Sequence, residues 1–381
     1  QTRGVMSRPW SEICARLDAL ATEISGAPYP PDPASAAAHL AEQVVCWLGW
    51  AVQYGDPRRP AFHRQNDLVT PWGGPNADNV YRHARIDPSR SYRIHGRMHG
   101  CDEFVLALRA GFMHQPVWGT LHNVSATDLG IGRGDEFELF LGGPPRQRAW
   151  VPVPDGAVMA SFREYYYDWS ATEPAVMTIE CLDADAGVPR PRTPAEVDTQ
   201  LLDAVTAVEH SVRNWNTYLD EHRAAGRDNV IAPPMRVTKG LPEARYAFCF
   251  WDLGPDDALV LETTVPEARY WSAQLYRMGW FDLIDPLERV CSLNHSQATP
   301  DRDGRVRIVV SHRDPGVVNW LDAGGHRTGL LTLRWFWSDG DPTYATTVVP
   351  LDSVRSDAVT PDERVALMAS RRRHLAWRFR T

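Results

Sequence analysis

Short runs in which apolar and polar residues alternate occur in two parts of this 381-residue chain. Alternation with a period of two places the apolar side chains on one face of a strand. Turns rich in Asp, Pro and Gly separate the runs, a spacing that is typical of antiparallel β-sandwiches. In the N-terminal half the runs lie at residues 92–94, 104–108, 137–141, 158–162 and 175–181. In the C-terminal half they lie at residues 246–251, 258–263, 268–276, 305–312 and 330–337.

Apolar residues that recur every three or four positions predict helices at residues 9–25, 34–54, 195–225 and 361–378. Thr193 precedes the longest of these and can cap its first turn. We therefore expect a mainly β, α+β fold. It would consist of antiparallel β-sandwich or jelly-roll modules with N-terminal helices, one long central helix and a C-terminal helix.

Five regions follow from these patterns. Residues 1–60 form an N-terminal helical region, and residues 61–190 form a first β-sandwich-like region. Residues 191–232 hold the long helix and a linker, residues 233–350 a second, jelly-roll-like β region, and residues 351–381 a C-terminal helix. A single sandwich decorated with helices is the alternative.

Composition narrows the class of protein. The net charge of −8 and the lack of a basic block argue against a nucleic-acid partner. No apolar run reaches the length of a membrane span, so we expect no membrane partner. The six scattered cysteines indicate reduced thiols and a cytoplasmic protein. These patterns are consistent with a monomer and with a homo-oligomer. The expected partner is a small molecule.

Polar and aromatic side chains concentrate between the last two strands predicted in the C-terminal half. His312 continues the apolar face of the strand at residues 305–312, and Asp314-Pro315-Gly316 has the composition of a type II turn. The loop at residues 317–327 then brings together Asn319, Trp320, Asp322 and His326. Such a loop favours a binding or active site, although a well-tied structural loop would have similar residues.

The same segment carries a family resemblance. The run SHRDPGVVNWLDAGGHRTGLLTLRWFW is similar to the signature of a bacterial family catalogued as domain of unknown function 1214. Upstream, GGPNADNVYRHARIDPSRSYRIHG resembles its frequent companion, domain of unknown function 1254, and REYYYDW fits the middle of such proteins. The resemblance implies a β-sandwich or jelly roll with helical additions, and it implies no particular reaction.

The chain lacks the sequence motifs of several kinds of catalytic site. The chain has no Gly-x-Ser-x-Gly elbow, no Gly-x-Gly-x-x-Gly after a strand and no Walker lysine. Its 13 histidines show no metal-binding spacing of the jelly-roll type. We therefore expect no cofactor and no metal site, and we keep a metal-dependent jelly-roll enzyme as the weaker alternative.

After these exclusions, the kind of site that the residues favour is an aromatic pocket that carries out acid/base chemistry. Histidine transfers protons readily near neutral pH, and arginine presents a planar fork of donors to an oxygen. The candidate catalytic residues are His312, His326, Asp322 and Arg163. The candidate substrate-binding residues are Asn319, Trp320, Tyr165, Trp271, Trp335, Arg313, Asn76 and Tyr81.

These residues lead to one preferred hypothesis and one alternative. The preferred one is an enzyme that acts on a small, largely apolar organic molecule by metal-free proton transfer, as a lyase, isomerase or cyclase. The alternative is a non-catalytic β-sandwich that binds a carbohydrate or a metabolite. The preferred hypothesis expects the loop at residues 317–327 to fold over a cavity walled by indole rings, whereas the alternative expects a shallow, exposed platform of tryptophans.

Overall fold

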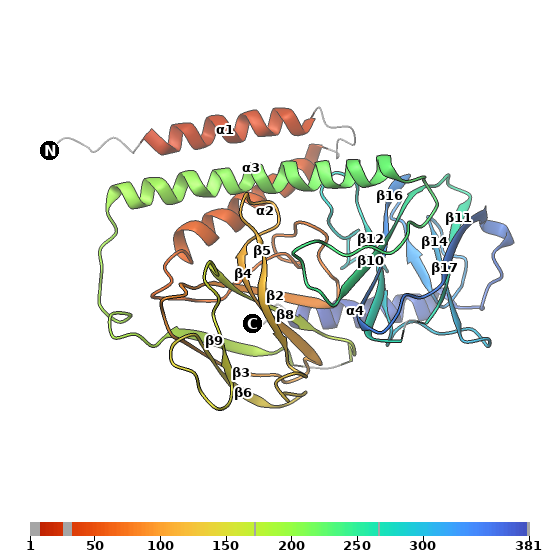
Figure 1. The fold of residues 1–381 in the computed structure, drawn as a ribbon. Helices are drawn as coiled ribbons and strands as arrows, with labels where there is room; N and C mark the ends of the chain where they lie inside the picture. Colours follow the sequence, from red (N-terminus) through yellow and green to blue (C-terminus); the bar gives the residue numbers. More distant parts are fainter. Residues whose placement is uncertain (1–7, 26–32, 171–172, 266, 379–381) are drawn as a thin grey trace.

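The computed structural model describes residues 8–25, 33–170, 173–265 and 267–378. Two β units lie side by side, and helices run along them (Figure 1). The sheets in the described part of the chain are antiparallel or mixed. This architecture confirms the predicted α+β, sandwich-type fold with strands before and after one long helix.

Two sheets form the N-terminal unit. The first sheet has the order β1 (His63–Arg64), β2 (Asn79–Arg85), β8 (Met159–Tyr165), β4 (Glu103–Gly111) and β5 (Gly119–Ser125). The second has the order β7 (Trp150–Val151), β6 (Glu136–Leu141), β3 (Tyr92–Arg97) and β9 (Val176–Cys181). Their facing apolar side chains, among them Leu106, Phe162 and Leu139, form one buried cluster.

Two further sheets form the C-terminal unit. The inner sheet has the order β10 (Ala244–Asp252), β16 (Thr328–Ser338), β12 (Ala268–Tyr276) and β13 (Ser292–Asn294). The outer sheet has the order β15 (Trp320–Asp322), β14 (Arg305–Ser311), β11 (Asp257–Thr264) and β17 (Tyr344–Pro350). The inner sheet faces the N-terminal unit, because Tyr270 and Phe336 share a buried cluster with Val105 of β4.

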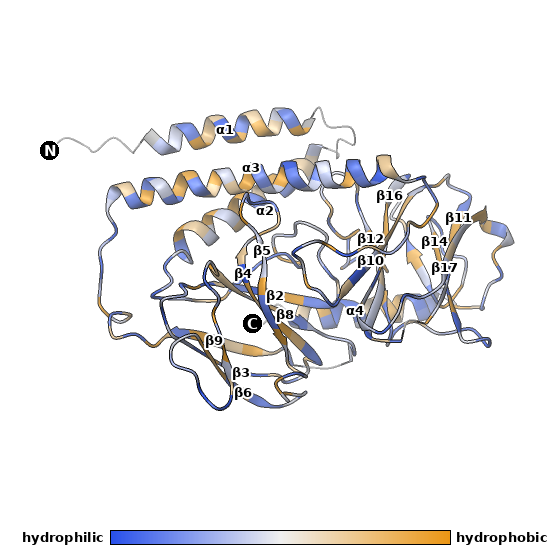
Figure 2. Ribbon diagram, viewed as in Figure 1, coloured by the Kyte–Doolittle hydropathy of each residue, from blue (hydrophilic) through white to orange (hydrophobic). Residues whose placement is uncertain are grey.

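The helices are α1 (Arg8–Ser25), α2 (Pro33–Leu48), α3 (Pro194–Ala225) and α4 (Pro361–Arg378), with short turns η1 (Gly49–Gln53) and η2 (Leu351–Ser353). The green α3 extends along both units (Figure 1). Polar and apolar residues alternate along it (Figure 2), and its buried residues include Val208, Val212 and Trp215. None of the helices in the described part of the chain has the length and apolar content that a membrane span needs.

Local predictions and structure differ at several places, since strands such as β5 and β17 lie outside the predicted runs. The helix expected at residues 34–54 is α-helical only to Leu48, because η1 then continues it with the wider π-type turn. Strand β2, which follows the polar residues after Pro75, lies outside the runs predicted from alternation. The loop at residues 317–327 contains the short strand β15, which pairs in parallel with β14.

A buried polar network joins the two units where Pro75–Asn79 meets β12. The Tyr270 hydroxyl lies 2.6 Å from Asp78 Oδ2 and 2.9 Å from Asn76 Oδ1. Gln274 Nε2 donates to Asn76 Oδ1 at 2.6 Å, and its Oε1 accepts from the Ala77 amide at 2.9 Å. Because buried polar groups need such partners, this network holds the two units in one relative position.

Candidate functional site

A cavity of about 110 Å³ lies between the first sheet and the inner sheet, and we call it the interunit cavity. By the measure on which one water needs roughly 10–15 Å³, it has room for several waters or a small organic molecule. Its lining residues come from both units and from α3. They are Asn66, Trp72, Gly73, Gly74, Asn76, Tyr81, His83, Arg109, Met113, Trp118, Arg163, Tyr165, Trp215, Tyr218, Val237, Gly240, Leu241, Ala244, Tyr246, Phe248, Phe281, Arg334 and Phe336.

Strand periodicity explains which side chains reach this cavity. Residues directly opposite each other on neighbouring strands share a face, and the register pairs Tyr81 with Arg163 and His83 with Ser161. The intervening residues of β2 and β8, such as Val80 and Phe162, join the core of the N-terminal unit. The odd-numbered residues of these strands therefore face the opposite way, toward the C-terminal unit and, at Arg85, toward Trp50 of η1.

The inner sheet contributes its even-numbered residues in the same way. Tyr246 of β10 pairs with Arg334 of β16, and Ala244 pairs with Phe336. All four line the interunit cavity. The odd-numbered Leu331 and Leu333 lie instead in the core of the C-terminal unit. The cavity is thus closed by the two sheet faces that each unit turns toward the other.

Three arginines are the main polar feature of the cavity. Arg109 is 8% exposed, Arg334 is 4% exposed and Arg163 is half-buried. Among the described residues, no carboxylate lies within ion-pair distance of any of the three, and the cavity lining contains no Asp or Glu. Arginine is rarely buried without a charged partner, so this arrangement departs from what folding alone favours.

The contacts that these guanidinium groups do make are few. Arg334 donates to the Tyr276 hydroxyl and lies over the rings of Tyr246 and Tyr276, at 5.6 and 5.7 Å from their centroids. The Arg163 guanidinium lies 5.6 Å from the centroid of the Tyr81 ring. In the described part of the chain, Arg109 Nε has no hydrogen-bond partner. Arg109 and Arg163 therefore keep donors available inside the cavity.

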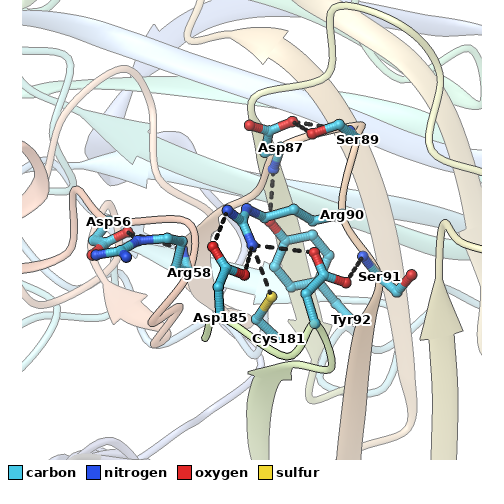
Figure 3. Close-up of polar contacts among 10 residues, drawn as sticks. Asp56, Arg58, Asp87, Ser89, Arg90, Ser91, Tyr92, Cys181 and Asp185 are labelled. Carbon is cyan, nitrogen blue, oxygen red and sulfur yellow. Dashed lines mark hydrogen bonds and ion pairs between the residues drawn. The ribbon is translucent and has the colours of Figure 1, made fainter. Parts of the chain in front are cut away.

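Arg90, by contrast, has carboxylate partners (Figure 3). Its Nη1 lies 2.7 Å from one oxygen of Asp185 and 3.1 Å from Asp183 Oδ2, and its Nη2 lies 2.9 Å from the other Asp185 oxygen. These hydrogen bonds raise the pKa of Arg90 above its ordinary value. Arg109 and Arg163 have no such carboxylate fork among the residues that the structure describes.

Burial sets the protonation states in the cavity. Burial, and next the charge of the nearby Arg163, lowers the pKa of Arg109 to about 9, so Arg109 remains mostly protonated at neutral pH. Burial raises the pKa of Tyr81 and of Tyr165, so both phenols keep their protons. The cavity thus combines positive charge with neutral hydroxyl groups.

His83 is the histidine that lines this cavity. Its Nδ1 lies 2.8 Å from Ser161 Oγ, and its Nε2 is buried without a hydrogen-bond partner among the described residues. Burial, and next the charge of Arg109, holds the pKa of His83 well below its ordinary value. The ring is therefore neutral at physiological pH, with a proton on one of its two nitrogens and a lone pair on the other.

Aromatic rings form most of the apolar wall. Trp72 and Trp215 are stacked at 6.2 Å between centroids, and Phe281 meets Trp215 edge-on at 5.9 Å. Gly73 and Gly74 have φ values of +60° and +69°, and a side chain on either would collide with Trp215 or Phe281. The two glycines therefore let the chain turn directly against the rings.

The structure brings four of the predicted site residues to the interunit cavity, namely Asn76, Tyr81, Arg163 and Tyr165. Arg163 and Tyr165 share the cavity face of β8, and Tyr81 is the cross-strand partner of Arg163. Asn76 also holds the two units together through Tyr270 and Gln274. Arg163 is the member of this group with the most unused hydrogen-bonding capacity.

The predicted residues of the segment from 312 to 326 lie elsewhere, on the edge of the outer sheet. The inner sheet stands between the outer sheet and the cavity, so these side chains do not line it. His312 Nε2 lies 3.3 Å from the Leu253 carbonyl oxygen, and Arg289 donates to Asp322 at 2.8 Å. His326 is half-buried, and burial lowers its pKa.

The remaining three residues of that segment have structural contacts. Asn319 Nδ2 donates to the Thr299 and Arg307 carbonyl oxygens at 2.8 and 3.0 Å. Trp320 donates to Ser311 Oγ at 2.9 Å and joins an apolar cluster with Leu351. Arg313 forms an exposed ion pair with Asp256 at 2.5 Å. The loop was expected to cover a cavity walled by indole rings, but parallel pairing with β14 ties it to the outer sheet, away from the interunit cavity.

Trp271 and Trp335 also lie away from the cavity. They are direct neighbours across β12 and β16, and both lie in the core between the inner and outer sheets. Tyr270 and Arg334, one position away in sequence, point to the opposite side. A strand buried on both faces carries apolar residues at every position, so alternation does not show which face meets the other unit.

Sequence reasoning missed Arg109, Arg334, His83 and Tyr246. Arg109 and Arg334 each follow a run of apolar residues in a strand, in ALR and LTLR, where a charge is unexpected. A charged residue inside an otherwise apolar strand was the available signal. Within the described residues, no three His, Cys, Asp or Glu side chains gather closely enough to hold a metal ion.

Comparison with known proteins adds a family match. Residues 255–340 match the model of a family described as Protein of unknown function (DUF1214). The match runs from β11 into β16 and so includes Arg334. It supports the resemblance to this family in the C-terminal unit. No curated protein matches the chain in sequence.

Two solved structures resemble this chain. An uncharacterized protein from Burkholderia cenocepacia has 27% sequence identity and a TM-score of 0.84, over 91% of this chain and 98% of its own. A protein from Vibrio parahaemolyticus has 16% identity and a TM-score of 0.46, over 81% of this chain and 99% of its own. The first likeness shows that this fold occurs in a second protein.

Proposed function

We propose that the protein binds a small, largely apolar organic molecule in the interunit cavity and performs metal-free acid/base chemistry on it. The reaction would be that of a lyase, an isomerase or a cyclase. One observation carries the proposal: an aromatic-walled cavity between the units holds polar groups without protein partners among the described residues. Pockets of this composition, with a few convergent polar groups, are the usual sites of small ligands.

In this proposal His83 takes the proton-transfer role, because His312 and His326 do not line the cavity. With its Nδ1–H donating to Ser161 Oγ, the ring keeps a lone pair on Nε2 and acts as a general base. Arg163 and Arg109 would stabilise negative charge that develops on a carbonyl oxygen of the substrate. Tyr165 and Tyr81, which keep their protons, would bind the same oxygen or return a proton.

A non-catalytic binding protein for a metabolite or carbohydrate is the second candidate. The burial of His83 Nε2 favours it, because a general base needs a direct approach to its substrate. The aromatic wall and the arginines would serve binding in either case. A measurement of turnover therefore distinguishes the enzyme from the binding protein. A measurement of binding tests the occupied cavity that both candidates require.

Binding is tested with indole, a neutral aromatic probe, by ligand-observed NMR. We expect the wild-type protein to bind indole, and Met113→Trp to raise its Kd at least tenfold because the larger side chain fills the cavity. Val318→Trp is the control, since Val318 is 43% exposed and outside the cavity lining. Equal binding by all three proteins would place the ligand elsewhere and contradict the proposal.

Turnover is tested with phenylacetone in D2O, in which a general base exchanges the protons next to the carbonyl for deuterium. We expect exchange by the wild-type protein, followed by 1H NMR, and at least a tenfold slower rate for His83→Gln. If the wild-type protein bound indole but caused no exchange, the binding-protein candidate would replace the enzyme. An undiminished rate for His83→Gln would remove His83 from the mechanism.

We further infer that the N-terminal unit corresponds to the companion domain of unknown function 1254. The motif that suggests it, Pro75-Asn76-Ala77-Asp78-Asn79-Val80-Tyr81, lies where that unit meets β12 of the C-terminal unit. Asn76 and Asp78 of this motif contact Tyr270 of the C-terminal unit. Because the motif contacts that unit, we expect it to occur in chains that contain both units.

A further inference from the structure

Arg109 and Arg163 form a cluster of positive charge that no carboxylate of the described chain neutralises. Arg163 lies on the central part of β8, and Arg109 lies on the neighbouring strand β4, where it pairs with Met159. Both side chains line the interunit cavity from the same sheet. The charge of Arg163 lowers the pKa of Arg109, so the two cations repel each other within the cavity.

The protein itself offers these cations little compensation. Arg163 has the face of the Tyr81 ring, and Arg109 Nε has no partner among the described residues. Arg334 completes the positive side of the cavity from the opposite sheet, although its Nη2 already donates to Tyr276. Elsewhere in the described chain some half-buried arginines pair with acids, as Arg58 with Asp56 at 3.0 Å and Arg90 with Asp185 at 2.7 Å (Figure 3), whereas Arg371 and Arg378 of α4 are buried with neutral hydrogen-bond partners.

We propose that the ligand of the interunit cavity is an organic oxyanion, whose carboxylate or phosphate group binds Arg109 and Arg163 and whose apolar body lies against the aromatic wall. This inference rests on the proposed function, because it names the class of molecule that the same cavity binds. Guanidinium groups bind either kind of oxyanion through paired N–H donors. Arg334 would add a third positive charge from the inner sheet.

The rest of the lining fits an apolar body. The rings of Trp72, Trp215 and Phe281 contact one another along one side of the cavity, and Phe248 and Phe336 line it from the inner sheet. The absence of Asp and Glu from the described lining means that no carboxylate there repels an anion. Charge and apolar surface together select a small acid with one bulky apolar end.

The experiment compares three probes of similar shape on the full chain by isothermal titration calorimetry: benzoate, phenyl phosphate and the neutral benzamide. We expect at least one anionic probe to bind at least tenfold more tightly than benzamide. A preference for benzoate identifies a carboxylate ligand, and a preference for phenyl phosphate identifies a phosphate ester. Arg109→Gln and Arg163→Gln should each reduce this preference at least fivefold and leave benzamide binding unchanged.

Arg97→Gln is the matched control, because Arg97 is an exposed arginine that contacts Glu136 at 3.4 Å on β3. It should leave the binding of all three probes unchanged. If either cavity variant failed to fold, Arg163→Lys would replace it, and a smaller loss of the anion preference would be expected.

The possible failures are distinct. If benzamide bound as tightly as both anions, the oxyanion inference would be wrong while the proposed cavity function stood. If neither indole nor any of the three probes bound the wild-type protein, the proposed function would fail as well. A preference for anions that survived in both glutamine variants would also overturn the inference, because the anion would then bind at another site.

Discussion

The arginines of the interunit cavity have no carboxylate partner in the described chain, and unlike Arg371 and Arg378 of α4, which are also buried without an ion pair there, they line a cavity. An arginine over an aromatic ring gains about 0.5–2 kcal/mol, whereas burying a charge costs several kcal/mol. The contacts of Arg163 with Tyr81 and of Arg334 with Tyr246 therefore offset only part of that cost. We infer that these side chains are retained for a ligand, at the expense of the stability of the free protein.

The first residue-scale prediction concerns stability. Arg109→Met removes a buried charge that has no ion-pair partner among the described residues and keeps an unbranched apolar side chain, so we expect the free energy of unfolding to rise by about 1–3 kcal/mol. Chemical denaturation of the ligand-free protein measures it. Arg82→Met is the comparison, because Arg82 forms a buried ion pair with Glu164 at 2.5 Å.

Breaking that pair should lower stability by roughly 3–5 kcal/mol, since Glu164 would remain buried without its partner. The two changes are chemically identical and both lie in the first sheet, but they are on opposite faces. A large loss of stability in Arg109→Met would show that Arg109 supports the fold, and would weaken its assignment to a ligand.

At the scale of single elements, the strand faces explain both the site and the errors in predicting it. Arg163 and Tyr165 were expected to act together, and β8 does place them on the same face. Trp335 was expected beside them, but it follows Arg334 by one position and so faces the outer sheet. A shift of one residue along a strand moves a side chain to the other face.

The turn at the end of β14 was predicted more accurately. Gly316 has a φ of +73°, and its amide donates to Asp314 Oδ1 at 2.8 Å, as expected for a turn that needs a glycine. The path of the chain after this turn was not predictable from local pattern, since the pairing of β15 with β14 depends on contacts across the sheet.

The start of α3 allows an element-scale prediction. Thr193 forms a capping box: the Glu196 amide donates to Thr193 Oγ1 at 3.2 Å, and the Thr193 amide donates to Glu196 Oε2 at 2.8 Å. Thr193→Ala should lower the free energy of unfolding by about 1 kcal/mol. Thr199→Ala, in the first part of the same helix, should be neutral or slightly stabilising because alanine favours helix interiors. Thermal and chemical denaturation distinguish the two.

At the scale of the whole molecule, buried histidines lie where the helices meet the β units. Burial lowers the pKa of His39 on α2 and of His63 on β1 to about 4 each, and that of His114 to about 3. The rings of Trp47, Trp72 and Phe112 surround His114, whose two ring nitrogens have no partner among the described residues. Each ring is therefore held neutral in the folded protein.

These histidines predict acid sensitivity. Their folded pKa values lie below the value of about 6.5 in the unfolded chain, so between these pH values the unfolded state binds more protons. Stability should be complete above pH 6.5 and should decrease as the pH falls toward 4, with each histidine contributing up to about 1.4 kcal/mol per pH unit. His114→Phe should flatten this dependence, measured by denaturation at a series of pH values.

Phe112→Leu provides the comparison for that experiment. It removes part of the same aromatic cluster without removing a titrating group, so it should lower stability by a similar amount at every pH. If His114→Phe left the pH dependence as steep as in the wild-type protein, His114 would not be among the groups that cause acid unfolding.

Local pattern alone defined the four helices and most of the longer strands of this fold, but it missed others, among them β2, β5 and β17. Periods of two and of three to four placed the strands and helices, and Thr193 and Gly316 marked the start of a helix and the position of a turn, because these features depend on neighbours in sequence. The tertiary structure decided the site. Its walls come from strands far apart in the chain, such as β2 with Tyr81 and β16 with Arg334. Strands buried on both faces carry no local sign of which face meets the other unit, and only the docking of the two units selects one.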